Sequence, residues 1–122
     1  MTRVLLVDDE TDLADLMASQ LTRAGFEVRC ADALLSAEAA NLETKFDVLV
    51  TDLHLPDGDG VDVARSLKIP ICLALTGSSV EADAKRLISE GFAMVLVKPV
   101  TSARLVAAIH DAVAAAAARP IG

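Results

Sequence analysis

Five polar residues stand at or just beyond the ends of short apolar runs, and their types could carry phosphoryl chemistry: Asp8, Asp9, Asp52, Thr76 and Lys98. Two carboxylates about 4 Å apart repel by roughly 4 kcal/mol at an effective dielectric constant of about 20, so three together need a compensating charge. One lysine does not supply enough positive charge to balance three carboxylates. Mg²⁺ is a suitable partner because it takes oxygen ligands and commonly joins one or two carboxylates to a phosphoryl group. The set therefore predicts a site for Mg²⁺ and a phosphate together.

An aspartate in such a site can be the nucleophile of phosphoryl transfer and form an aspartyl phosphate. A metal ion and a lysine then neutralise the charge on the phosphoryl oxygens. On this hypothesis Asp52 is the acceptor, Lys98 is the fixed cation, and Thr76 donates a hydrogen bond to the modified group.

Each of these residues, taken alone, has a simpler explanation. Asp8 or Asp9 could cap a following helix, and Asp52 could belong to a turn. Thr76 could cap a turn with its neighbour, and Lys98 could be the solvated end of a strand. The chemical interpretation therefore depends on all five residues meeting at one edge of the fold.

The apolar runs predict the strands that would bring these residues together. A run that is apolar at every position is expected of a strand covered on both faces, and an alternating run of an edge strand. Central strands are predicted at Val4–Val7, Val48–Val50, Ile71–Leu75 and Met94–Val97, and an edge strand at Phe26–Cys30.

Helical spacing between the strands predicts five helices. They are expected near residues 13–21, ending at Gly25, and over 33–43, 61–67, 79–90 and 101–118. Strands and helices that alternate in this way form a parallel sheet with right-handed crossovers and helices on both faces. Ligands of such sheets bind beyond the carboxyl ends of the strands, which is where the five polar residues would meet.

Length, composition and charge restrict the class of protein. The chain has 122 residues, 53% of them hydrophobic, so one domain with its own core is expected. The net charge of −7 argues against a nucleic-acid groove and against adsorption to an anionic membrane. No leader and no apolar run of roughly 20 residues is apparent, so a soluble, cytoplasmic protein is expected. Cys30 and Cys72 lack CxxC spacing and a nearby histidine, which favours buried free thiols.

Over nearly its whole length the chain resembles the receiver domain of two-component response regulators. The motifs that carry the resemblance are the pair Asp8-Asp9, Asp52 within VLVTDLHLPDGDG, Thr76-Gly77 and Lys98-Pro99. The resemblance implies a flavodoxin-like (βα)5 doubly wound α/β fold, with a parallel five-stranded sheet in the order 2-1-3-4-5. It also implies a receiver domain over residues 1–118 and a tail or linker stub at 119–122.

The same resemblance implies roles for the residues. Asp52 would accept a phosphoryl group from a sensor histidine kinase or a histidine phosphotransfer protein, with Mg²⁺ as cofactor. Asp9 and Asp52 would bind the metal directly, Asp8 through water, and His54 through its backbone carbonyl. The Lys98-Pro99 peptide bond would be cis.

The resemblance describes a signalling switch rather than an enzyme. The phosphorylated domain would act on a downstream protein target or output domain, without itself binding nucleic acid or membrane. Slow autodephosphorylation is implied, at a rate tuned by His54 and Ser78.

The sequence departs from the family pattern in several places. Val95 stands where many receivers carry an aromatic that swings inward with the switch, so a response would run through Thr76 and the loop 77–79. The third helix is short, and Gly58 replaces an apolar residue, which predicts a more mobile loop. The last strand lacks the acidic residues that precede it in one dimerising class, so a monomer or weak dimer is expected.

Two other functions stay open. A degenerate receiver could serve only as a protein-interaction module. A phosphatase with an aspartyl nucleophile would share an acceptor Asp, a Thr and a Lys, but it needs a second Asp where this chain has His54. A calcium loop beginning at Asp57 is excluded because Val61 and Lys68 occupy positions that need oxygen ligands. A turn that opens the third helix is predicted there instead.

Overall fold

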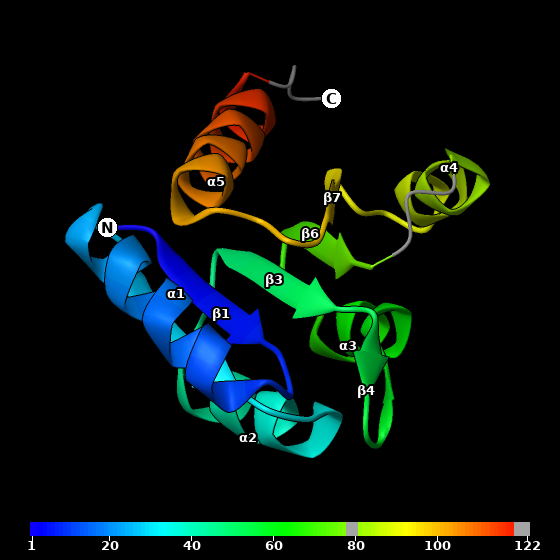
Figure 1. The fold of residues 1–122 in the computed structure, drawn as a ribbon, viewed down its shortest axis with the longest axis horizontal. Helices are drawn as coiled ribbons and strands as arrows, with labels where there is room; N and C mark the ends of the chain where they lie inside the picture. Colours follow the sequence, from blue (N-terminus) through cyan, green and yellow to red (C-terminus); the bar gives the residue numbers. More distant parts are fainter. Residues whose placement is uncertain (78–80, 119–122) are drawn as a thin grey trace.

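The main sheet consists of five parallel strands. The computed structural model describes residues 1–77 and 81–118, the side chains of 81–83 excepted. The strands are β1 (Arg3–Val7), β2 (Glu27–Ala31), β3 (Val48–Asp52), β6 (Ile71–Thr76) and β7 (Met94–Val97). They lie in the order β2-β1-β3-β6-β7, and Figure 1 shows β1, β3, β6 and β7 following one another. Counted along the chain this is the order 2-1-3-4-5, so the prediction of a flavodoxin-like doubly wound sheet is confirmed.

Five helices cover the two faces of the sheet within the described residues. They are α1 (Thr11–Arg23), α2 (Leu34–Glu43), α3 (Gly60–Leu67), α4 (Glu81–Ser89) and α5 (Ser102–Ala117). Leu21 of α1 and Leu105 of α5 belong to one buried cluster, whereas Ala37 of α2, Val63 of α3 and Leu87 of α4 belong to the other. The predicted helices are confirmed in number and place, although the expected start of α4 at residue 79 lies outside the described residues.

A short hairpin follows the third main strand, and the sequence analysis did not predict it. It consists of β4 (His54–Leu55) and β5 (Gly58–Asp59), which pair antiparallel as a separate two-stranded sheet. Two-residue strands are too short to show the alternation of apolar and polar residues that predicts a strand. The sequence therefore indicated only a turn before α3. The turn prediction itself is confirmed, because the Asp59 side chain caps α3 by accepting a hydrogen bond from the Asp62 amide at 2.9 Å.

The last main strand, β7, lies at an edge of the sheet, so its prediction as a central strand is wrong. Its run is nevertheless apolar because both of its faces contact the core: Val95 packs on one core cluster and Met94 on the other, although Val97 is 45% exposed. Cys30 on the opposite edge strand is only half-buried, which corrects the prediction of a buried thiol. Cys72 is buried as predicted, and both thiols are free.

Helix ends follow the local sequence. Gly25 comes directly after the last turn of α1 and has φ 103°, a conformation that favours glycine, so the predicted end of this helix is confirmed. The third helix is short as predicted, with eight residues, and Lys68 ends it with φ 54°. No helix among the described residues combines the length and apolar character needed to cross a membrane.

The buried face of α5 generates a stability prediction. Replacing fully buried Leu105 by Ala should lower the free energy of unfolding by about 2–5 kcal/mol, because the methyl groups lost leave a cavity. Leu42→Ala is the matched control: Leu42 is 89% exposed, so the expected change is within about 0.5 kcal/mol. The chain has no Trp or Tyr, so urea unfolding is best followed by far-UV circular dichroism. Similar losses in the two variants would contradict the placement of α5.

Candidate functional site

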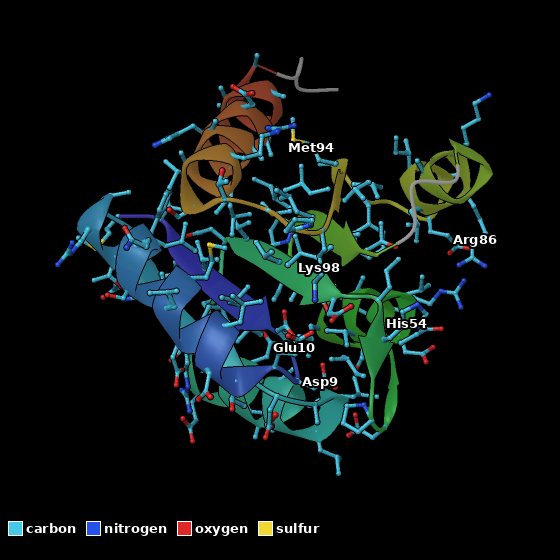
Figure 2. The ribbon with its side chains drawn as sticks, in the orientation of Figure 1. Asp9, Glu10, His54, Arg86, Met94 and Lys98 are labelled. Carbon is cyan, nitrogen blue, oxygen red and sulfur yellow. The ribbon has the colours of Figure 1, made fainter. Side chains whose placement is uncertain are left out.

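Five of the six predicted site residues lie at the carboxyl ends of the strands of the main sheet. Asp8 and Asp9 follow β1, Asp52 ends β3, Thr76 ends β6, and Lys98 follows β7. Because β1, β3, β6 and β7 are successive neighbours, their ends bring residues that are far apart in sequence to one place. Figure 2 shows Lys98 reaching toward the end of β3.

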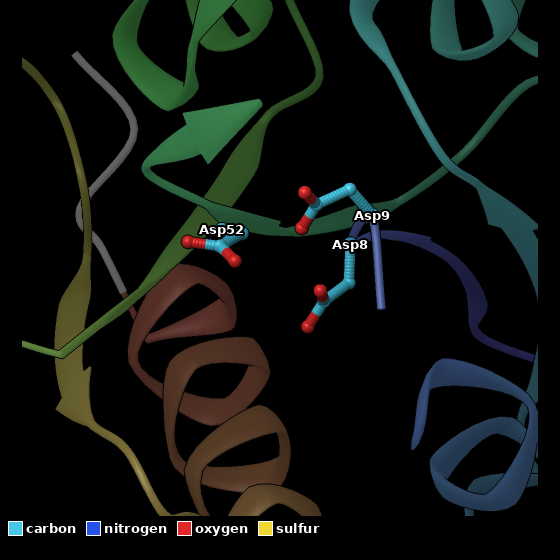
Figure 3. Close-up of side chains that lie close together, drawn as sticks. All are labelled: Asp8, Asp9 and Asp52. Carbon is cyan, nitrogen blue, oxygen red and sulfur yellow. The ribbon is translucent and has the colours of Figure 1, made fainter. Parts of the chain in front are cut away.

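Three carboxylates form the centre of the site. One carboxylate oxygen from each of Asp8, Asp9 and Asp52 lies within 4.8 Å of the others, and Figure 3 shows the three side chains together. Asp8 and Asp52 are buried, with 4% and 7% of their surface exposed, whereas Asp9 is exposed. A group of carboxylate oxygens with one side open to solvent is a donor set that suits a hard divalent cation.

Lys98 is the cation that faces the buried carboxylates. Its Nζ donates hydrogen bonds to Oδ2 of Asp52 at 2.8 Å and to Oδ2 of Asp8 at 3.2 Å. Burial works to lower the pKa of Lys98, but the hydrogen bonds to Asp52 and Asp8, together with their negative charges, outweigh burial and raise that pKa. The ion pairs therefore contribute to stability at neutral pH, and the contribution of the Lys98 charge is lost as pH rises through the raised pKa. The Lys98-Pro99 peptide bond is cis, as predicted.

Backbone amides orient the two buried carboxylates. Asp8 Oδ1 accepts a hydrogen bond from the amide of Glu10 at 2.9 Å, and Asp52 Oδ1 accepts one from the amide of His54 at 3.2 Å. Among the described residues, the Asp9 carboxylate has no such partner. Asp8 does not cap the first turn of α1, because the N-cap position is held by Glu10. Asp8 is therefore not the cap of this helix and belongs instead to the acidic cluster.

Thr76 and His54 lie beside the cluster rather than within it. Thr76 is buried, and its backbone carbonyl accepts a hydrogen bond from the amide of Lys98 at 2.7 Å. It lines a cavity of about 210 Å³ together with exposed His54 and with Arg86 of α4. The predicted contribution of Ser78 lies outside the described residues.

Gly60 is a residue of this site whose role the sequence analysis did not identify. A Cβ atom placed on it would lie 2.8 Å from the backbone oxygen of Asp52, closer than real side chains approach. The amide of Gly60 donates a hydrogen bond to the carbonyl of Leu53 at 3.1 Å. Glycine therefore lets the start of α3 pack directly against the segment that follows Asp52, and the Asp59-Gly60 pair in the sequence was the signal.

Known proteins resemble this chain in both sequence and structure. The model of the response regulator receiver domain family matches residues 4–110. The transcriptional regulatory protein PrrA of Mycobacterium leprae is 37% identical over 114 residues, which cover 88% of this chain and 48% of PrrA. The response regulator receiver protein CpdR of Brucella abortus is 30% identical over 99 residues, which cover 81% of this chain and 74% of CpdR.

Solved structures agree with these relatives. The crystal structure of a response regulator receiver domain protein from Clostridium thermocellum aligns with a TM-score of 0.85 and 28% identity, over 96% of this chain and 98% of that one. Fold, acidic cluster and family match together define the class: a receiver domain of two-component signal transduction. The chain belongs to the response regulator receiver domain family. The matched region covers 48% of the length of PrrA, so the chain spans about half of this relative.

The pairing of Lys98 with two buried carboxylates generates a second stability prediction. Lys98→Met should lower the free energy of unfolding by about 3 kcal/mol at pH 7 with a chelator present, because both carboxylates would stay buried without their cation. Lys45→Met is the control, since Lys45 is exposed and has no ion pair within the described part of the chain. Urea unfolding of both variants measures the difference. Equal effects would show that the two ion pairs contribute nothing to stability.

Proposed function

We propose that Asp52 accepts a phosphoryl group from the phosphohistidine of a sensor kinase or of a phosphotransfer protein. A carboxylate oxygen of Asp52 attacks phosphorus, the P–N bond to the histidine breaks, and the bonding electrons leave with the imidazole, which takes up a proton. The phosphorylated surface then changes the binding of a downstream target or output domain.

The observation that carries this proposal is the environment of Asp52. It is nearly buried, yet one carboxylate oxygen is oriented by the His54 amide and the other by Lys98 Nζ. Lys98 already contacts the acceptor, so its ammonium group could also donate a hydrogen bond to a phosphoryl oxygen. Such charge-assisted hydrogen bonds are stronger than those between neutral groups. Buried Thr76, at the end of the neighbouring strand, is the proposed donor to a second phosphoryl oxygen.

Mg²⁺ is the proposed cofactor, and the residues present fit it. Asp9 and Asp52 would bind it directly, Asp8 through water, and His54 through its backbone carbonyl. When bound, the ion would neutralise charge on the carboxylates and on the transferring group. The exposure of Asp9 and the engagement of Asp8 with Lys98 support this division of roles.

The response to phosphorylation is proposed to be a switch and not turnover of a substrate. The modification adds about −1.5 to −2 charges at Asp52, which Thr76 and Lys98 would counter. Val95 packs on the core and has no ring to turn, so the response would not use an aromatic side chain. We place slow autodephosphorylation at the same site, with His54 lining its entrance.

Membership of the family supports the proposed setting. We infer a cytoplasmic domain, monomeric or weakly dimeric, whose partners are a kinase or phosphotransfer protein and a downstream target. The negative net charge of −7 supports partners that are proteins rather than nucleic acid or membrane.

Incubation with acetyl phosphate and Mg²⁺ tests the phosphoacceptor. Intact mass should show one added phosphoryl group in the wild type and none in Asp52→Asn. Asp47→Asn is the control, because Asp47 directly precedes β3 at the opposite end of the same strand and should leave the adduct unchanged. No adduct in the wild type would favour a degenerate receiver, and steady hydrolysis of a phosphate ester would favour a phosphatase.

The unequal surroundings of Asp8 and Asp9 predict unequal effects on Mg²⁺ binding. Asp9→Ala should weaken Mg²⁺ binding by about tenfold or more, equivalent to about 1.4 kcal/mol, because it removes a direct ligand. Asp8→Ala should weaken it less, because that carboxylate already accepts hydrogen bonds from Lys98 and Glu10. Isothermal titration calorimetry with MgCl₂ measures both constants, and an equal or reversed order would overturn the assignment.

A further inference from the structure

The N-terminus of α2 has no capping side chain of its own. Ala33 holds the N-cap position in an extended conformation, with φ −159° and ψ 171°, and its methyl group cannot accept a hydrogen bond. Ser36 Oγ accepts from the amides of Asp32 and Ala33, both at 3.1 Å, but these amides precede the helix. The first amides inside the helix therefore need an acceptor from another part of the chain.

Asp57 supplies that acceptor from the hairpin that follows Asp52. Its Oδ1 accepts a hydrogen bond from the amide of Leu34 at 2.7 Å, and its Oδ2 accepts one from the amide of Leu35 at 3.1 Å. The hydrogen bond to Leu34 is the main reason that the pKa of Asp57 lies below its ordinary value. A carboxylate at this place also complements the positive end of the helix dipole.

The contact joins α2 to the tip of the β4–β5 hairpin. His54 pairs with Asp59 and Leu55 pairs with Gly58, so Asp57 lies in the connecting turn. Figure 1 shows this turn beside α2. Packing supports the contact, because a Cβ atom on Gly58 would lie 3.3 Å from Cδ2 of Leu34. Glycine at residue 58 thus permits a close approach to α2.

The other end of the hairpin begins at the acidic cluster. The amide of His54 donates a hydrogen bond to the carboxylate of Asp52, and the amide of Gly60 donates one to the carbonyl of Leu53. The hairpin is therefore held by Asp52 at its base, by α3 through the Asp59 cap, and by α2 through Asp57. Loss of the α2 contact would leave the tip without its anchor and the backbone of His54 less well fixed.

We propose that Asp57 is a positioning residue for the phosphorylation site: by capping α2 it holds the β4–β5 hairpin so that the backbone of His54 faces Asp52 and the Mg²⁺ that the site would hold. This inference rests on the proposed function of Asp52 for its consequence in phosphoryl transfer. The capping contact itself does not depend on that function.

The phosphorylation test uses Asp57→Ala and Asp57→Asn in the full chain. The initial rate of adduct formation with acetyl phosphate, measured by intact mass against Mg²⁺ concentration, should give a half-saturating concentration about tenfold higher in Asp57→Ala, as expected when an outer partner of a metal site is lost. Asp57→Asn should show a smaller shift, because its amide oxygen still accepts one hydrogen bond. Equal shifts would mean that the lost charge, and not the cap, is responsible, and would overturn the proposal.

Ile109→Val is the control for general stability. Ile109 is fully buried on α5, in the core cluster on the opposite side of the sheet from α2, so this variant weakens the fold without touching the hairpin. It should keep the wild-type Mg²⁺ dependence. A tenfold rise of the half-saturating Mg²⁺ concentration in this control would mean that any loss of stability has this effect, and it would overturn the proposal.

A measurement without metal or phosphodonor separates this inference from the proposed function. Hydrogen exchange of the His54 amide, followed by NMR, should be faster in Asp57→Ala than in Ile109→Val and intermediate in Asp57→Asn. An unchanged exchange rate in both Asp57 variants would overturn the positioning role, even if the wild type is phosphorylated. Faster exchange together with no wild-type adduct would support the positioning role and reject the phosphoacceptor.

Discussion

The interaction on which this structure depends is the crowding of three carboxylates against one ammonium group at the end of the sheet. Asp8 and Asp52 are buried and share Lys98, and the exposed Asp9 adds a third negative charge within 4.8 Å. Burial of charge is costly unless it is paired and hydrogen-bonded, and here the pairing is incomplete. The remaining excess of negative charge suits a divalent cation, which would also offset the charge that a phosphoryl group adds to Asp52.

The surrounding backbone is arranged to hold this charge in place. Lys98 is 46 residues from Asp52 and 90 from Asp8 in sequence, so the pairs exist only because β1, β3 and β7 end at the same edge of one sheet, with β6 between β3 and β7. Gly60 brings the start of α3 against the backbone of Asp52, and Asp57 ties the intervening hairpin to α2. The segment after the acceptor is thus fixed at its tip by α2 and at its end by α3, two helices that also form the core.

Charges away from the carboxyl edge are paired differently. Arg3 pairs with Glu27 and Arg29 pairs with Glu43, and the four side chains are 43–63% exposed. Exposed ion pairs of this kind contribute about 0–1 kcal/mol. The contrast in burial separates these exposed pairs from the buried pairs of Lys98 with Asp8 and Asp52.

The sequence by itself determined the fold class, the five main strands and helices, and the five residues at the carboxyl edge. It could do so because apolar runs report burial directly and because parallel strands must end on the same side. It misplaced β7 as a central strand, since an edge strand that contacts the core on both faces can be as apolar as an inner one. It missed the hairpin and the links from Gly60 and Asp57, because short strands have no period and a cap supplied from 22 or 23 residues away leaves no local pattern. Which carboxylate is buried, which is open, and which amide orients each one were decided only by tertiary structure, since they depend on distances between segments that the chain's order does not contain.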